Sequence, residues 1–237
     1  MAPSFAQRSD RLEEMEAPGV AEAALLRCLN DLARANTLTL ARPPTLAWLA
    51  RATRGLRRGA ALSLLDVGFG DGDMLRAIHR WAARRGLEPR LMGVDLSPAS
   101  ARAAAAATDP AWGIRFLTGD VFALRAEAPI DFVISSLVAH HMDDATLVRF
   151  IGWMEANARR GWFVNDLHRH WVAYYGFMAL SSAAWLDGMV RRDGLVSVTR
   201  AFTKADWRRL LALAGLSADA AEVAWRFPFR ICVGRIR

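Results

Sequence analysis

The stretch "LLDVGFGDGD", residues 64–73, decides the fold class of this 237-residue chain. It ends an apolar run over 61–68 that is typical of a buried strand, and a helix is expected over 73–86. Between them Gly68, Gly70 and Gly72 form G-x-G-x-G, which permits a tight turn and close approach of a ligand to the backbone. A strand, a glycine turn and a helix in this order predict one unit of a parallel, doubly wound α/β sheet.

The rest of the chain repeats this alternation. After 61–68, strands are expected at 90–97, 113–120, 130–138 and 161–167, and two strand-like segments close the chain. Helices are expected over 20–35, from near Thr45 after the break "RPP", from Ser97-Pro98, over 143–157 and over 203–216. We therefore predict a Rossmann-like, mostly parallel sheet with an antiparallel final strand. Ligands of such sheets bind beyond the carboxyl ends of the strands, and all five strands end in polar or glycine residues.

The charges around the glycine turn narrow the choice of ligand. A dinucleotide fingerprint would have its last glycine at position 73, where this chain has Asp73, with Asp71 close by. Two carboxylates would repel a pyrophosphate, and no Gly-Lys-Ser/Thr follows to make a P-loop. The acidic turn instead suits a cationic ligand without phosphates, such as S-adenosylmethionine (SAM).

The motif series as a whole, over roughly residues 60–170, resembles that of class I SAM-dependent methyltransferases. The resemblance rests on "LLDVGFGDGD", on Asp95 at the end of strand two, on "GD" at 119–120 and on "DFVISSLVAHHMDD" at 131–144. It implies SAM as cofactor. The methionine part would border Asp66, Gly68, Gly70 and Gly72, with Ser135 and Ser136 beside the methyl group. The ribose would bind at Asp95 and Leu96, and the adenine at Asp120 and Val121. Plain capping, turn and strand-end roles for these residues stay open.

The methyl acceptor is expected under a helical lid. We predict an N-terminal lid at 1–55 and a methyltransferase domain at 56–237, with a helical insertion at about 168–200 that is rich in aromatic residues. A cavity lined by such residues favours a flat, apolar acceptor. "VNDLHRH…AYYGF" is similar to bacterial small-molecule methyltransferases associated with polyketide pathways, which implies O-methylation of a hydroxylated aromatic product. A C-methyltransferase of quinone-type lipids is the alternative, and an RNA methyltransferase rests on basic charge alone.

A general base would help such a reaction, because a phenol has a pKa near 10. The candidates are Asp166 and the histidines His140, His141, His168 and His170. If a helix follows Leu167, the side chains of His168 and His170 point about 200° apart, so only one can serve the cavity. We predict His168 as the base, with Asp166 orienting it or contacting the acceptor. We predict no metal, because only one carboxylate lies near this histidine pair in the sequence.

The composition of the chain indicates its partners and its cellular compartment. The net charge is +7, but the arginines are scattered through alanine-rich helices, so we expect solvated helix faces and no nucleic-acid partner. Cys28 and Cys232 lie far apart, as in proteins of a reduced compartment, and the N-terminus is too polar for a signal peptide. The uncharged stretch 171–186 is shorter than the about 20 residues that a membrane span needs. We expect a cytoplasmic protein without stable membrane insertion, and the sequence leaves a homodimer open.

Overall fold

The computed structural model describes residues 4–17, 22–125 and 127–237. A single seven-stranded sheet runs in the order β3-β2-β1-β4-β5-β7-β6. Its first five strands are parallel, whereas β7 runs antiparallel to both β5 and β6. The predicted fold class, including the antiparallel final strand, is confirmed. The strands are β1 (Ala61–Val67), β2 (Glu88–Asp95), β3 (Arg115–Thr118), β4 (Ile130–Ser136), β5 (Ala158–Leu167), β6 (Glu222–Arg226) and β7 (Arg230–Ile236).

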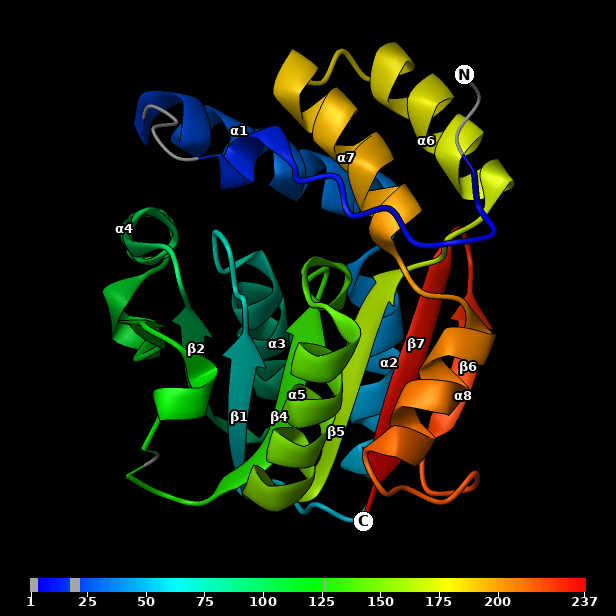
Figure 1. Ribbon diagram of the computed structural model, residues 1–237. Helices are drawn as coiled ribbons and strands as arrows, with labels where there is room; N and C mark the ends of the chain where they lie inside the picture. Colours follow the sequence, from blue (N-terminus) through cyan, green and yellow to red (C-terminus); the bar gives the residue numbers. More distant parts are fainter. Residues whose placement is uncertain (1–3, 18–21, 126) are drawn as a thin grey trace.

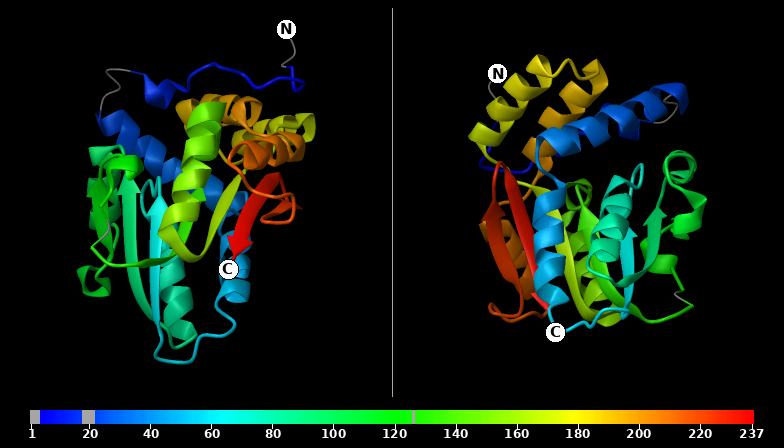
Figure 2. Two further views of the ribbon diagram at one scale, coloured as in Figure 1. Left: turned by 60° about the horizontal axis from the view of Figure 1, so that its bottom comes forward. Right: turned by 180° about the vertical axis from the view of Figure 1, so that it is seen from behind.

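Helices cover both faces of the sheet (Figures 1 and 2). One face carries α5 (Asp144–Asn157) and α8 (Lys204–Leu213), whose buried Phe150 and Trp207 join the core cluster on that side. The other face carries α2 (Arg42–Ala52) and α3 (Asp73–Arg84), with α4 (Pro98–Ala106) beside β2 and β3. Because the central strands are buried on both faces, their sequences are continuous apolar runs.

Capping residues set most of the helix starts that the sequence predicts. Ser97 caps α4, and Thr203 caps α8 in a capping box with Asp206. One predicted start was wrong, because α2 begins at Arg42 and not near Thr45. The two prolines that follow Arg42 occupy the first turn, where no N–H is needed, so they start the helix instead of delaying it. Four 3₁₀ turns complete the described elements: η1 (Glu14–Glu16), η2 (Pro110–Trp112), η3 (Val121–Ala123) and η4 (Ala139–His141).

Three helices lie across the carboxyl ends of the strands and form the lid: α1 (Glu22–Leu38), α6 (Trp171–Ala183) and α7 (Gly188–Arg200) (Figure 1). Residues 4–17, the N-terminal strap, are tied to α7 by the Ser9 amide, which donates to the Thr199 carbonyl at 3.1 Å. Arg8 connects the strap to η4, the turn that follows β4, by donating to the His140 carbonyl at 3.2 Å. In the described part of the predicted lid segment 1–55, α1 and the strap cover the carboxyl ends of the strands, whereas α2 packs on a face of the sheet.

The path of the chain also locates a crevice. From β1 the chain moves outward to β2 and β3, and it then returns to place β4 on the other side of β1. The loops after β1 and β4 therefore leave in opposite directions, which opens a crevice between them at the carboxyl ends. Within the described residues, no helix is both long and apolar enough to cross a membrane.

Candidate active site

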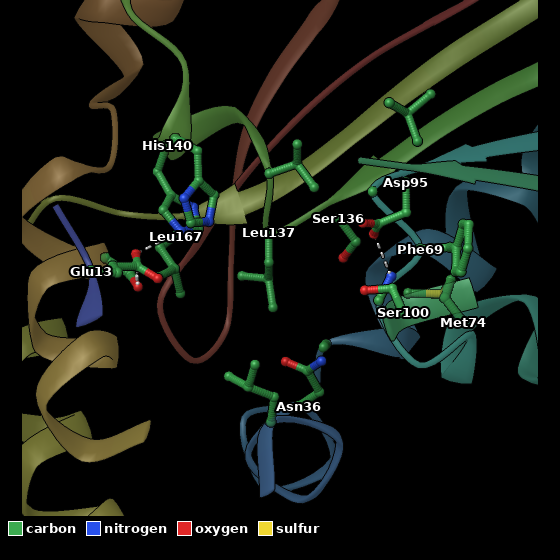
Figure 3. A pocket seen from close by; sticks show the side chains of 18 of the residues that line it. Glu13, Asn36, Phe69, Met74, Asp95, Ser100, Ser136, Leu137, His140 and Leu167 are labelled. Carbon is green, nitrogen blue, oxygen red and sulfur yellow. Dashed lines mark hydrogen bonds and ion pairs between the residues drawn. The ribbon is translucent and has the colours of Figure 1, made fainter. Parts of the chain in front are cut away.

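A cavity of about 1140 Å³ lies between the lid and the carboxyl ends of the strands. Single-ligand sites usually measure about 300–1,000 Å³, so this cavity has room for two ligands. Asp95 and Ser136 lie toward one end, which we call the cofactor end, and Glu13 and His140 toward the other, the acceptor end (Figure 3). Leu137 lies between the two ends (Figure 3).

The cofactor end contains buried polar atoms that have no hydrogen-bond partner in the described part of the chain. Asp66 Oδ1 and Ser136 Oγ are both in this state, and both residues line the cavity. Burial raises the pKa of the Asp66 carboxyl well above its ordinary value, and the charges of Asp73 and Asp95 add to the effect. A cationic group beside Asp66 would favour its charged form and give Oδ1 a partner. The site therefore fits the ammonium group of SAM.

Further along the cavity wall, Asp95 is held in a fixed orientation. Its carboxylate accepts hydrogen bonds from the Gly70 amide at 3.0 Å and from the Ser97 amide at 2.8 Å. Each carboxylate oxygen accepts more than one hydrogen bond, so Asp95 has capacity for ribose hydroxyls. Asp120 accepts from the Phe122 amide at 2.9 Å. The four residues that the sequence assigned to ribose and adenine all line the cavity: Asp95, Leu96, Asp120 and Val121.

Two residues predicted to contact the cofactor do not line the cavity. Gly72 has φ +76° and lies against Phe116, 2.9 Å from where a Cβ would be, so close packing requires a glycine there. Ser135 is buried, and its hydroxyl donates to the Val67 carbonyl at 2.9 Å. Their positions give both residues structural roles. Gly68 and Gly70, by contrast, line the cavity, as predicted.

Gly68→Ala is expected to lower the free energy of unfolding by about 2–4 kcal/mol. Gly68 has φ +73°, and an added Cβ would overlap the side chain of Val138, so backbone strain and steric overlap combine. Gly215→Ala is the matched control, because Gly215 has φ +80° but no atom within 4 Å of the Cβ position. Urea unfolding should show a loss of only about 1–2 kcal/mol for the control. Equal losses of unfolding free energy in the two variants would show that the Val138 side chain moves aside without destabilising the protein.

At the acceptor end, His140 is held between two carboxylates. Its Nδ1 donates to Asp166 Oδ1 at 2.7 Å, and its backbone amide donates to Asp166 Oδ2 at 2.8 Å. Its Nε2 lies 3.5 Å from Glu13 Oε1, and all three side chains are buried. Burial alone would lower the pKa of His140, but the charges and hydrogen bonds of Asp166 and Glu13 raise it to about 9. Burial acts to raise the pKa of Asp166, yet His140 holds it below its ordinary value.

His141 completes this cluster. Its ring centroid lies 4.2 Å from that of His140, and it is half-buried and lines the cavity. The donor atoms of Glu13, His140 and His141 all lie within 4.8 Å of one another, so the three side chains could hold a cation. The absence of a metal stays a prediction, which elemental analysis of the purified protein would check.

The structure corrects the sequence-based geometry of His168 and His170. β5 ends at Leu167 and α6 begins at Trp171, so the residues between them are not helical. His170 is extended, with φ −154° and ψ 142°, and it caps α6. On extended backbone, residues two apart share a face, and the two rings stack with centroids 5.2 Å apart. The predicted separation of about 200° was therefore wrong, and neither ring lines the cavity.

The position of His168 does not favour its predicted role as base. Burial lowers its pKa to about 4, and the positive charges of His170, Lys204 and Arg169 act in the same direction. An imidazole that weakly basic is poorly matched to a phenol with a pKa near 10. Asp166, which was predicted to orient His168, hydrogen-bonds to His140 instead.

Two residues at the site carry no recognisable signal in the sequence. Glu13 lies in the N-terminal strap, within a polar segment that matches no motif, and only tertiary packing brings it to His140. Leu137 has φ +60°, which is uncommon for a side chain of this size, and its amide donates to the Asn165 carbonyl at 3.0 Å. Such conformations persist where the surrounding structure enforces them, often at functional sites.

The aromatic residues expected to line the acceptor end divide into two groups. Phe177 of α6 lines the cavity and packs against Gly194 of α7. Trp171 and Trp185 face outward, with 58% and 89% of their surface exposed. Phe229, which lies against Gly176 of α6, also lines the cavity. Aliphatic lining residues include Met15, Leu32, Ala173, Val190 and Val198.

Comparisons with known proteins bear on the family and the fold. Residues 64–161 match the family model described as a methyltransferase domain, and no curated protein matches the sequence. The fold is similar to that of the plantazolicin methyltransferase BpumL in complex with SAH (S-adenosylhomocysteine). The TM-score is 0.63 at 11% identity, over 91% of this chain and 95% of that one. It is also similar to magnesium protoporphyrin IX methyltransferase (ChlM) from Synechocystis PCC 6803 with bound SAH. That TM-score is 0.52 at 17% identity, over 94% and 90% of the two chains. The family match over residues 64–161 indicates a SAM-dependent methyltransferase, and the fold is the one that these SAH-bound methyltransferases share.

Proposed function

We propose that this protein uses SAM to methylate a hydroxyl group of an aromatic or polyketide-like small molecule. The observation that carries the proposal is the division of one cavity into two chemically different ends. The cofactor end offers Asp66, whose Oδ1 has no hydrogen-bond partner among the described residues, together with Asp95. At the acceptor end, the buried side chain of His140 lies between those of Glu13 and Asp166. Apolar side chains of the lid line the space beside the acceptor end, which favours an apolar acceptor.

The residues of this chain would prepare the acceptor for transfer. When bound, SAM supplies a methyl group whose bond to sulfur breaks, with the electron pair returning to sulfur, as the acceptor oxygen forms the new C–O bond. His140 takes the hydroxyl proton, and its pKa of about 9 lies close to that of a phenol, near 10. Asp166 fixes the orientation of the imidazole, and Asp166 and Glu13 together stabilise its protonated form. The lid excludes water and aligns the acceptor.

If His140 must be neutral to accept the proton, kcat/KM should rise with pH and level off above an apparent pKa of about 9. The negative charge of Asp166 favours the protonated imidazole. Asp166→Asn should therefore move the rising limb of the pH profile of kcat/KM to lower pH. Rate measurements from pH 6 to 10 would test both expectations. The limb should stay in place when the acceptor is replaced by one with a different hydroxyl pKa. A limb that follows the acceptor would assign the ionisation to the substrate.

The experiment that tests the function is methyl transfer from labelled SAM to a panel of hydroxylated aromatic compounds. Each compound is paired with an analogue whose hydroxyl is already methylated, and products are identified by mass and NMR. Label in the free phenols alone supports O-methylation. Label in the blocked analogues would indicate the alternative, C-methylation of a quinone-type precursor. Label in neither, with SAM bound, would refute this acceptor class.

The setting of the enzyme follows from the same proposal. A small-molecule acceptor requires no nucleic-acid partner, and we place the reaction in the cytoplasm as a step of secondary metabolism. Cell fractionation would test the location. Salt-dependent retention of the protein on RNA would instead favour the RNA methyltransferase hypothesis.

A further inference from the structure

Arg230, the first residue of β7, is a buried cation that forms no ion pair with an acidic side chain among the described residues. It pairs in register with Leu167, which places it at the carboxyl end of β5, and only 1% of its surface is exposed. Its guanidinium donates to Thr39 Oγ1 at 3.0 Å, to the Thr39 carbonyl at 3.4 Å and to Asn165 Oδ1 at 3.5 Å. All three acceptors are neutral, and two of the distances exceed the usual range for a strong hydrogen bond. No ion pair of Arg230 occurs within the described part of the chain.

Such an arrangement is costly in a protein built only for stability. A buried charge normally has an opposite charge or a full set of short hydrogen bonds. Burial lowers the pKa of Arg230 to about 10, which still leaves the guanidinium charged at neutral pH. The buried Arg169 shows the usual solution, because it lies 3.1 Å from Asp206 and also donates to two carbonyls. Arg230 lines the cavity, whereas Arg169 does not.

The same cavity also contains a buried acid that forms no ion pair among the described residues. Asp66 is 1% exposed, and none of the described residues gives its Oδ1 a hydrogen bond. Asp66 and Arg230 do not pair with each other; Asp73, which interacts electrostatically with both, forms its ion pair with Arg42 at 3.1 Å. The lining of one cavity thus includes an acid and a guanidinium that form no ion pair within the described residues, although the charges of Asp166 and Asp73 favour the charged guanidinium. Their natural complement is a zwitterion with an ammonium and a carboxylate a few ångströms apart, as in an amino acid.

We propose that Arg230 is a carboxylate-binding residue of this cavity and that it binds the carboxylate of the methionine moiety of SAM. The inference rests on the proposed function, because SAM supplies the amino-acid zwitterion. Asp66 takes the ammonium end, and Arg230 takes the carboxylate end with its planar guanidinium. Arg230 is then a residue that selects the intact cofactor over ligands that keep the adenosine but lack the amino-acid part.

Calorimetry with two ligands tests this assignment. SAH carries the amino-acid part, whereas 5′-methylthioadenosine keeps the adenosine and the sulfur but lacks it. Arg230→Met should lower the affinity for SAH by about 10- to 100-fold and leave that for 5′-methylthioadenosine unchanged. Arg230→Lys should retain part of the SAH affinity, because it keeps the charge without the planar fork. An equal loss for both ligands would overturn the assignment.

Thermal unfolding of the ligand-free protein separates binding from a structural role. Methionine removes a buried charge that lacks an acidic partner, so Arg230→Met should unfold at the same or a higher temperature than the wild type. Arg169→Met is the matched control, because it removes the ion-pair partner of Asp206, and it should unfold at a lower temperature with unchanged SAH affinity. A marked drop in unfolding temperature for Arg230→Met, without any loss of SAH affinity, would make Arg230 structural.

The remaining outcomes identify the source of the carboxylate. If Arg230→Met binds SAH normally, the cofactor assignment is overturned. The affinity of the SAH-loaded wild type and Arg230→Met for 4-hydroxybenzoate then shows whether Arg230 binds a carboxylate of the acceptor. Equal affinities for 4-hydroxybenzoate would overturn carboxylate binding by Arg230 altogether. Failure of the proposed function looks different, because in that case the wild type itself would bind neither SAM nor SAH.

Discussion

His140→Ala is expected to lower kcat by about 10²- to 10⁴-fold, while the affinity for SAH stays at the wild-type value. The reason is the position of His140, between Asp166 and Glu13 at the acceptor end of the cavity and away from Asp66 and Asp95. Removing the imidazole takes away the proton acceptor but no contact with the cofactor. Single-turnover rates with labelled SAM, together with calorimetry with SAH, would separate the two effects.

His168→Ala provides the comparison for this prediction. Its imidazole is half-buried but does not line the cavity, so its removal should leave kcat within about twofold of the wild type. A large loss in His168→Ala with little change in His140→Ala would restore the assignment of the base to His168. Because His140 is part of a buried ion-pair network, its loss also lowers stability. Unchanged SAH affinity therefore serves as the check that the His140 variant is folded.

The second large effect is expected at the cofactor end, where Asp95→Ala should weaken SAH binding by about 10- to 150-fold. The Asp95 carboxylate is fixed by the Gly70 and Ser97 amides, so it meets the ribose hydroxyls without further ordering. The substitution removes the acceptor for these hydroxyls and also releases the amide of Gly70 in the glycine turn. Calorimetry with SAH would measure the loss.

Asp109→Ala is the matched control for Asp95. Asp109 also accepts a hydrogen bond from a main-chain amide two residues on, that of Ala111 at 2.9 Å, but it does not line the cavity. Both variants lose a local turn contact, and only Asp95→Ala should lose affinity. If both bind SAH as the wild type does, Asp95 is a capping residue only, as its sequence context before Ser-Pro also allows.

The sequence predicted the fold because the fold depends on local patterns, and the same patterns led to the residues proposed for the cofactor end. Strands buried on both faces appear as apolar runs, and the glycine turn marks the first strand–helix junction. Parallel strands place their carboxyl ends at one edge, so Asp95, Asp120 and Ser136 could be assigned to one cavity without knowledge of the packing. The exceptions are Gly72 and Ser135, whose backbone lies in the right loop or strand but whose neighbours are Phe116 and the Val67 carbonyl.

Only the tertiary structure decided the acceptor end. The sequence placed four histidines near strand ends, and the choice among them depended on where β5 stops and α6 begins, a boundary that helical periodicity does not mark. Packing selected His140, because η4 brings its ring onto Asp166 of the neighbouring strand. The strap then adds Glu13 from the far N-terminus, and Arg230 arrives from the final strand. Local pattern therefore determined the sheet and its cofactor turn, whereas contacts between residues distant in sequence determined the charges at the acceptor end.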